Sequence, residues 1–170
     1  MKNMAERLTQ KDLEKIQEEI EYRKLVIRKQ ALEAVKEARA HGDLSENFEY
    51  HAAKKDKNQN ESRIRYLERL VKNAYIVQDH SSHDEIGLNN TVEVYFEEDD
   101  IYETYKLVTS IRGNSLKGMI SIESPMGKAI LNKKVGERVF IKTSPDDGYY
   151  IKIMKIHKTI DEDGDQIRSF

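Results

Sequence analysis

The stretch Ala40–Tyr50, AHGDLSENFEY, separates two long charged segments that both have the composition of helices. Gly42 is the only glycine or proline in the first 86 residues, and a lone glycine there fits the left-handed residue that ends a helix. Asp43 and Glu46 have the spacing of a capping box, in which each carboxylate accepts a backbone N–H at the next helix start. The two acids also bring two carboxylates together at the end of a rod, so a structural and a functional role are both open.

The segments on both sides predict two long amphipathic helices. The first runs from about Gln10 to Ala40, which gives ~45 Å at ~1.5 Å per residue. Its apolar stripe is irregular in the middle turn: Leu13, Ile16 and Ile20, then Ile27, Ala31, Ala34 and Ala38. The second carries a heptad seam, with steps of three and four: Tyr50, Ala53, Lys57, Asn60, Ile64, Leu67, Val71 and Ala74. Residues 1–78 therefore predict an antiparallel coiled-coil hairpin with an acidic tip at 42–47.

After residue 90 the hydrophobic period changes from that of a helix to that of a strand. The expected strands are Thr91–Phe96, Ile101–Val108, Gly118–Ile122, Val139–Lys142 and Tyr149–Ile156, with a short helix from Pro125 to Leu131. This predicts a small antiparallel sheet with one helix on it, over residues 91–158. A polar linker is expected over 79–90 and a frayed acidic tail over 159–170. The fold class is α+β.

Composition excludes several classes of protein. The chain contains no cysteine, which removes disulfide scaffolds, Cys-ligated metal sites and thiol chemistry. No apolar run approaches the ~20 residues that span a bilayer, and the first residues lack a signal-peptide core. We therefore expect a cytoplasmic protein without a membrane partner.

Charge is distributed unevenly along the chain. Residues 1–78 hold 17 Lys and Arg against 14 Asp and Glu, and the remainder holds 12 against 17. This is compatible with an N-terminal part that associates with nucleic acid. The tip is surrounded by basic side chains: Lys36, Arg39, His41, His51, Lys54, Lys55 and Lys57. They form either an ordinary solvated face or an electropositive collar suited to a phosphate backbone. A protein-only metal site from His41, His51, Asp43 and Glu46 is disfavoured, because exposed carboxylates and imidazoles make a weak cage.

Two stretches resemble the Gre factors, the bacterial transcript-cleavage factors GreA and GreB. Residues 38–53, ARAHGDLSENFEYHAA, are similar to the tip of the Gre hairpin. Residues 120–131, ISIESPMGKAIL, followed by Lys134-Val135-Gly136-Glu137, are similar to the motif of the Gre C-terminal domain. They occur in the family's order and separation, and the resemblance covers nearly the whole chain.

The resemblance implies an accessory factor rather than an enzyme. Gre factors bind RNA polymerase at the rim of its secondary channel through an FKBP-like domain, and insert the coiled coil toward the active centre. The polymerase then cleaves its own backtracked RNA, with a Mg²⁺ held jointly. By position, Asp43 and Glu46 are the catalytic and metal-holding acids, and Arg39 and Lys54 contact the RNA 3′ end. Glu123, Ser124 and Pro125 meet the rim. We expect a bacterial monomer that holds no cofactor alone, and we also expect an association with DNA.

Residues 108–117, VTSIRGNSLK, depart from the family's pattern, because they are polar or basic where Gre factors have an acidic loop. The subtype is left open, since Ala52-Ala53 resembles GreA and residues 63–67 resemble GreB.

Three other functions are compatible with parts of the sequence. The first is a secondary-channel regulator that inhibits polymerase without cleavage. The second is a prolyl isomerase or chaperone, which the FKBP-like domain suggests. The third is a plain coiled-coil adaptor, which accounts for the seam but not for the acids and the collar at the tip.

Overall fold

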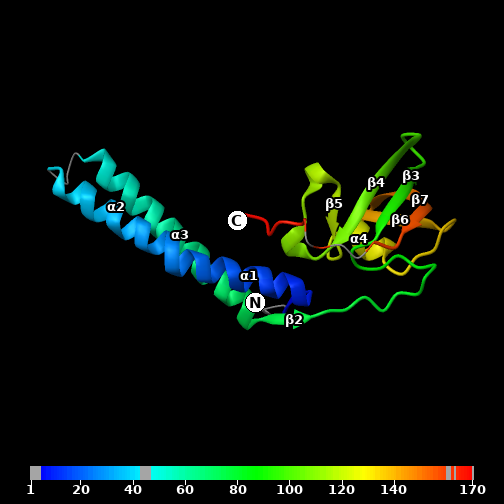
Figure 1. Cartoon of the computed structure of the whole chain (residues 1–170). Helices are drawn as coiled ribbons and strands as arrows, with labels where there is room; N and C mark the ends of the chain where they lie inside the picture. Colours follow the sequence, from blue (N-terminus) through cyan, green and yellow to red (C-terminus); the bar gives the residue numbers. More distant parts are fainter. Residues whose placement is uncertain (1–4, 43–46, 160–161, 163, 170) are drawn as a thin grey trace. The chain divides into compact units, whose positions relative to one another are not determined.

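The computed structural model describes residues 5–42, 47–159, 162 and 164–169. The chain forms two compact units: a helical unit that includes Asp12–Ala74, and a sheet unit formed by Arg7–Lys11 and Tyr75–Ser169. The predicted α+β fold is confirmed, with a helical hairpin followed by a sheet that carries one short helix (Figure 1). The likeness of the sheet unit to FKBP stays a prediction.

The first arm of the hairpin is a helix with one irregular turn. It consists of α1 (Gln10–Tyr22), the π-helical turn η1 (Arg23–Ile27) and α2 (Arg28–Ala40). The π-helical turn falls where the apolar stripe of the sequence is irregular, because an extra residue in one turn shifts the faces that follow. Ala34, expected in the stripe, is exposed.

The second arm, α3 (Phe48–Lys72), packs its seam against the first arm. Ile64 and Leu67 are fully buried, as is Ile16 of α1, and Asn60 is 4% exposed. Burying each large aliphatic side chain stabilises the hairpin by roughly 1.5–3 kcal/mol. Ala74 lies outside this seam, because α3 ends at Lys72 and the chain continues into strand β2 (Ala74–Ile76), which pairs with β1 (Glu6–Leu8). The sequence pattern did not predict this two-stranded sheet.

A polar layer crosses the hairpin at the π-helical turn. The Glu19 carboxylate accepts from Arg23 Nε at 2.7 Å and from Arg63 Nε at 2.9 Å, and Arg23 Nη1 donates to Asn60 Oδ1 at 3.0 Å. Burial raises the pKa of Glu19, but the hydrogen bonds and charges of Arg63 and Arg23 outweigh burial and lower it. Because these groups satisfy one another only in one alignment, the layer fixes the register of the two arms.

The main sheet has five strands in the order β5-β4-β3-β7-β6. The strands are β3 (Thr91–Phe96), β4 (Ile101–Val108), β5 (Met119–Ser121), β6 (Arg138–Ser144) and β7 (Asp147–His157). The prediction of a wholly antiparallel sheet is wrong, because β5 runs parallel to β4, with Leu107 opposite Ile120. The short 3₁₀ turns η2 (Ser110–Arg112) and η3 (Ser115–Lys117) occupy the connection between them.

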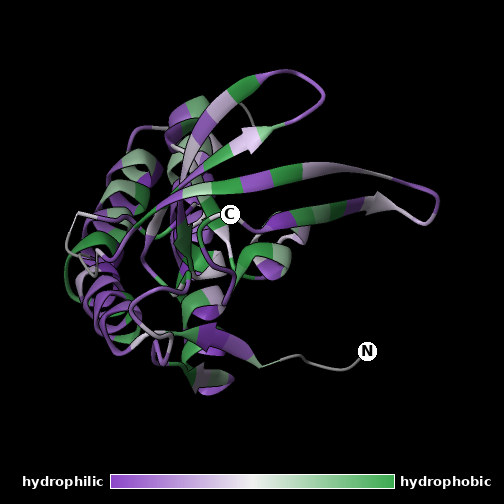
Figure 2. Cartoon of the chain, turned by 90° about the vertical axis from the view of Figure 1, so that its right-hand side faces the viewer, coloured by the Kyte–Doolittle hydropathy of each residue, from purple (hydrophilic) through white to green (hydrophobic). Residues whose placement is uncertain are grey.

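One face of the sheet forms the core under helix α4 (Pro125–Ile130). Hydrophobic and hydrophilic residues alternate along the strands, as Figure 2 shows, so alternate side chains point to this face. Ile86 and Leu88 also belong to the core. Residues 86–90, in the expected linker, are therefore buried parts of the sheet unit rather than a plain connector.

The acidic tail was predicted to be frayed, and this is wrong for its described residues. Glu162 is only 8% exposed. Thr9 Oγ1 donates to Glu162 Oε2 at 2.8 Å, and Asp165 accepts from Lys106 Nζ at 2.9 Å. Ion pairs with residues distant in sequence hold the segment against the sheet unit, which its local composition does not reveal.

Candidate functional site

The described residues of the hairpin tip approach the acidic stretch from both sides. Helix α2 ends at Ala40 with His41 as its C-cap, and Gly42 follows with a φ of 141°. This positive φ is the reason for glycine at this position. Asp43 and Glu46, the predicted catalytic and metal-holding acids, lie outside the described residues.

Asn47 joins the two helix ends. Its Oδ1 accepts from Tyr50 N at 3.0 Å, which makes it the N-cap of α3, and its Nδ2 donates to the Ala38 carbonyl at 2.7 Å. One neutral amide thus satisfies an N–H in the first turn of the second helix and adds a second donor to a carbonyl in the last turn of the first helix, which also accepts from His41 N at 3.3 Å. The N-cap of α3, which begins at Phe48, is therefore Asn47 rather than Asp43; the capping box predicted for Asp43 and Glu46 falls on residues outside the described ones. The sequence contained the signal, since Asn is as good an N-cap as Asp.

The predicted RNA-contacting residue Arg39 is organised by an aromatic ring. Its guanidinium carbon lies 5.7 Å from the centre of the Tyr50 ring. A hydrogen bond from Arg39 and the nearby charges of Lys54 and Lys57 lower the pKa of Tyr50, although desolvation opposes them. Arg39 is exposed, so its charge remains available to an anion while its direction is restricted.

Lys54, the second predicted RNA-contacting residue, is exposed on a polar hollow of α3. The hollow has a volume of about 560 Å³ and is lined by His51, Lys54, Lys55, Asn58, Gln59 and Ser62. Three of these side chains can carry positive charge and three offer neutral hydrogen-bonding groups, which is a suitable surface for phosphate oxygens. Lys54 and Arg39 are therefore both exposed cations near the tip, close to the start of α3 and in the last turn of α2.

Acidic and metal-ligating groups are sparse in the described part of the tip. Glu49 Oε2 lies 3.5 Å from His41 Nδ1, and both side chains are largely exposed. Within residues 5–42, 47–159, 162 and 164–169, no group of three or more His, Asp or Glu side chains could hold a metal ion. The described residues thus provide positive charge and a fixed scaffold, but no complete metal site.

The predicted polymerase-contacting residues Glu123, Ser124 and Pro125 connect β5 with α4. Ser124 is the N-cap of α4: its Oγ accepts from Gly127 N at 3.0 Å and donates to the Ser121 carbonyl at 2.7 Å. Pro125 takes the first helical position, where its missing N–H costs no hydrogen bond. The structure thus brings the three residues together on a stiff corner.

Two further residues shape this corner. The Glu123 carboxylate lies 3.3 Å from Arg7 Nε and 3.6 Å from Lys128 Nζ, so its charge is partly balanced within the sheet unit. A Cβ at Gly127 would lie 1.9 Å from the Ser121 carbonyl oxygen, so only glycine fits there. The glycine of SPMG is therefore explained by close packing, which the sequence alone did not reveal.

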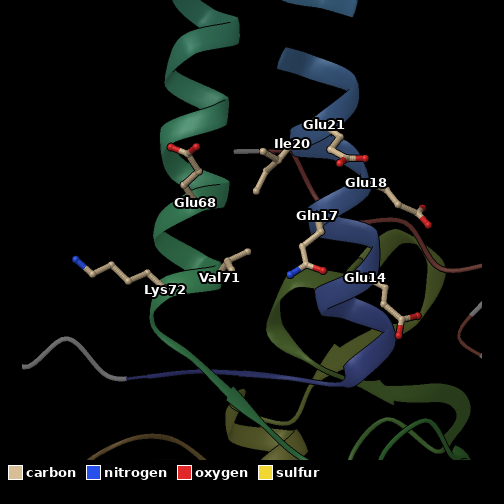
Figure 3. A pocket seen from close by; sticks show the side chains of 8 residues that line it. All are labelled: Glu14, Gln17, Glu18, Ile20, Glu21, Glu68, Val71 and Lys72. Atoms are coloured by element: carbon tan, nitrogen blue, oxygen red, sulfur yellow. The ribbon is translucent and has the colours of Figure 1, made fainter. Parts of the chain in front are cut away.

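A separate pocket lies at the base of the hairpin between α1 and α3, away from the hairpin tip (Figure 3). It has a volume of about 610 Å³, and its lining is Glu14, Gln17, Glu18, Ile20, Glu21, Glu68, Val71 and Lys72. Four carboxylates around two aliphatic side chains would repel RNA phosphates. The pocket therefore has the wrong charge for the chemistry expected at the tip.

Two family models account for most of the chain. Residues 6–76 match the model described as "Transcription elongation factor, N-terminal", and residues 81–158 match "Transcription elongation factor, GreA/GreB, C-term". The chain belongs to the GreA/GreB family. The family membership applies to both units, because each contains one of the two matches.

Individual relatives of the GreA/GreB family are similar over nearly their full length. Transcription elongation factor GreA of Bacillus subtilis is 39% identical over 149 residues, which are 88% of this chain and 94% of that protein. GreA of Thermoanaerobacter pseudethanolicus is 41% identical over 152 residues, 89% of this chain and 96% of that protein. The solved GreA factor homolog 1 of Thermus thermophilus is 27% identical, with 89% of this chain and 97% of that one covered and a TM-score of 0.40.

The family findings leave some expectations without support. Neither the family descriptions nor the names of these relatives mention DNA, so the expected association with DNA is not supported. Among the helices that the structure describes, none is long and apolar enough to cross a membrane.

Proposed function

We propose that this chain rescues arrested transcription by stimulating RNA polymerase to cleave its own backtracked RNA. It is an accessory factor of the GreA/GreB family, and RNA polymerase is its partner. In this proposal the corner Glu123–Pro125 docks at the rim of the secondary channel and the hairpin enters the channel. The chain acts as a monomer in the bacterial cytoplasm, where the polymerase works.

The construction of the hairpin tip is the observation that carries the proposal. Helix α3 alone has 25 residues, which extend about 37 Å at ~1.5 Å per residue. The polar layer of Glu19, Arg23, Asn60 and Arg63 fixes the register of the two arms, and Asn47 closes the far end. A slender rod of fixed register can deliver side chains to a site too narrow for a globular domain.

Asp43 and Glu46 are the side chains that the rod would deliver. Capping of α3 does not account for them, since Asn47 performs it. In the polymerase complex their carboxylates would complete the ligands of a Mg²⁺, which supplies charge stabilisation and an activated water for phosphodiester hydrolysis. In the proposal this ion is shared with the polymerase, and the chain alone is inert toward RNA.

Arg39 and Lys54 offset the repulsion between an acidic tip and RNA. Two carboxylates that approach a phosphate chain without nearby cations would lose affinity through like-charge repulsion. Arg39 beside Tyr50 and Lys54 in the basic hollow lie on the described part of the same tip. In the proposal they hold the extruded RNA 3′ end while the acids take part in the hydrolysis.

The test uses a purified bacterial polymerase that is stalled and backtracked on a labelled transcript. We expect the wild-type chain with Mg²⁺ to shorten the RNA, and Asp43→Asn or Glu46→Gln to bind polymerase normally but lose cleavage by at least about a hundredfold. Glu49→Gln is the matched control, because Glu49 is an exposed acid in the first turn of α3. It should cleave as the wild type does.

Two outcomes would overturn the proposal. Normal cleavage by Asp43→Asn and Glu46→Gln would remove the acids from the reaction. Binding of the wild-type chain without any cleavage would instead favour a secondary-channel regulator of the polymerase.

A further inference from the structure

The described residues of the tail after residue 158 are attached to the connection between β4 and β5. The C-terminal family match ends at residue 158. In the sheet unit, Arg168 N donates to the Ile111 carbonyl at 2.8 Å, so the tail runs along η2. A segment beyond the family match thus contacts the 3₁₀ turns that lead into β5.

Arg112 is the centre of this contact. Its side chain is fully buried, and its Nη1 donates to Asp165 Oδ2 at 2.8 Å and to Asn89 Oδ1 at 2.7 Å. Its Nε donates to Thr109 Oγ1 at 3.2 Å, and Lys106 Nζ donates to the same Asp165 oxygen at 2.9 Å. A buried guanidinium needs a balancing carboxylate, because removing a charge from water without a partner is strongly unfavourable.

The ionisation of the Asp165 carboxyl agrees with this geometry. Burial would raise the pKa of the carboxyl, but the hydrogen bonds and charges of Lys106 and Arg112 outweigh burial and lower it. Asp165 is therefore ionised at neutral pH and balances two cations from two segments of the sheet unit. Glu162 adds a second carboxylate 3.8 Å from Arg112 Nη2.

A short series of hydrogen bonds leads from Arg112 to the proposed docking corner. Ser110, in the same 3₁₀ turn, lies with its Oγ 2.9 Å from Ser121 Oγ. Glu123 N donates to Ser121 Oγ at 3.0 Å, and Ser124 Oγ donates to the Ser121 carbonyl at 2.7 Å. A shift of η2 therefore changes the partners of both Glu123 and Ser124.

We propose that Arg112 and Asp165 are positioning residues for polymerase docking: the tail carboxylate fixes η2, and η2 fixes the corner Glu123–Pro125. The inference rests on the proposed function, in which that corner meets the polymerase. The tail supplies the carboxylate that the buried Arg112 needs, from a distant part of the sequence. The role is indirect, since neither residue needs to touch the polymerase.

The experiment measures three properties of the intact chain: affinity for core RNA polymerase, cleavage rate at saturating factor, and thermal unfolding. Asp165→Asn keeps the shape of the side chain and removes its charge. We expect roughly tenfold weaker polymerase binding and an unchanged cleavage rate at saturation, because the acidic tip is intact. Asp165→Glu should recover most of the affinity, since it restores the charge. Asp84→Asn is the matched control, because it removes an exposed ion pair with Lys134 from the same unit.

A double-mutant cycle separates positioning from general stabilisation. If Asp165 acts through the corner, the double variant Asp165→Asn/Glu123→Ala will lose less binding free energy for the polymerase than the sum of the losses in the two single variants. Hydrogen exchange should also rise at the amides of Glu123 and Ser124 in Asp165→Asn. Additive losses with unchanged exchange at these amides would overturn the inference.

Failure of the inference is distinguishable from failure of the proposed function. If Glu123→Ala weakens binding while Asp165→Asn and Arg112→Met both bind as the wild type does, only the positioning role is wrong. If Glu123→Ala and Ser124→Ala leave binding unchanged, the docking corner itself is wrong, and the inference is overturned with it. Binding is measured well below the unfolding temperature of each variant, so that loss of fold does not imitate loss of docking.

Discussion

Replacing Asn47 by Ala tests whether one amide holds the hairpin tip closed. The change removes the acceptor for Tyr50 N and the donor to the Ala38 carbonyl. Loss of an N-cap costs about 1 kcal/mol, and loss of a neutral hydrogen bond at a partly exposed site costs about 1 kcal/mol more. Together, about 2 kcal/mol corresponds to a roughly thirtyfold increase in opening of the tip.

Amide hydrogen exchange is the direct assay, because it reports local opening separately from global unfolding. In Asn47→Ala the amides of Tyr50 and His51 should exchange faster by about thirtyfold, while those around Ile64 and Leu67 change much less. Asn47→Asp is the matched control: it keeps an acceptor for Tyr50 N but cannot donate to Ala38. It should give an intermediate effect.

The same variant has a functional consequence. A tip that opens more often presents its acids in the productive arrangement for less of the time, so cleavage should fall while affinity for polymerase stays the same. Unchanged exchange at Tyr50 and His51 in Asn47→Ala would refute the assignment of Asn47 as the residue that closes the tip.

Three further changes probe the rest of the molecule. Arg63→Met breaks a buried pair with Glu19 and should lower the free energy of unfolding of the hairpin by about 3 kcal/mol, measured by urea denaturation followed by circular dichroism. The pKa of Glu19 in the folded state is lowered from 4.5. The contribution of its carboxylate to stability is therefore fully present above pH 4.5 and is lost as the pH falls through the folded pKa. The free energy of unfolding, measured between pH 7 and 3, should decrease less steeply in Glu19→Gln than in the wild type. Gly127→Ala should destabilise the sheet unit by about 2 kcal/mol through the clash with the Ser121 carbonyl, and a normal unfolding temperature would contradict that explanation.

The long elements could be predicted because their periodicity extends over many residues. The seam of α3 repeats for more than three heptads, so errors at single positions do not change the conclusion. The irregular stripe in the first arm coincides with the π-helical turn, but the sequence pattern did not predict that turn. The polar residue Asn60 in the seam is explained by its bond to Arg23, which the sequence could not reveal, since the two lie on different arms.

The start of α3 could not be fixed from local sequence, because several good caps compete. Asp43 and Asn47 are equally acceptable N-caps by residue type, and Glu46 makes the first of them look stronger. What selects Asn47 is the carbonyl of Ala38 on the other arm, which accepts from its amide nitrogen. A carboxylate cannot donate that hydrogen bond.

The tail and the parallel strand were missed for a related reason. Acidic, glycine-containing termini are usually frayed, but Asp165 lies against Arg112 and Lys106, more than fifty residues away in the sequence. The direction of β5 depends on the path of the two 3₁₀ turns before it, and a three-residue strand carries too little pattern to reveal its direction.

The use of an amide rather than a carboxylate as the cap of α3 suits the proposed chemistry. A carboxylate that caps a helix accepts hydrogen bonds from backbone N–H groups, and the helix dipole partly neutralises its charge. Such a group would be a poorer ligand for a cation shared with another protein. Asn47 caps α3 with a neutral side chain, so the carboxylates of Asp43 and Glu46 are not needed as the cap of this helix. In the proposed function, holding the tip and doing chemistry at the tip thus fall to different residues.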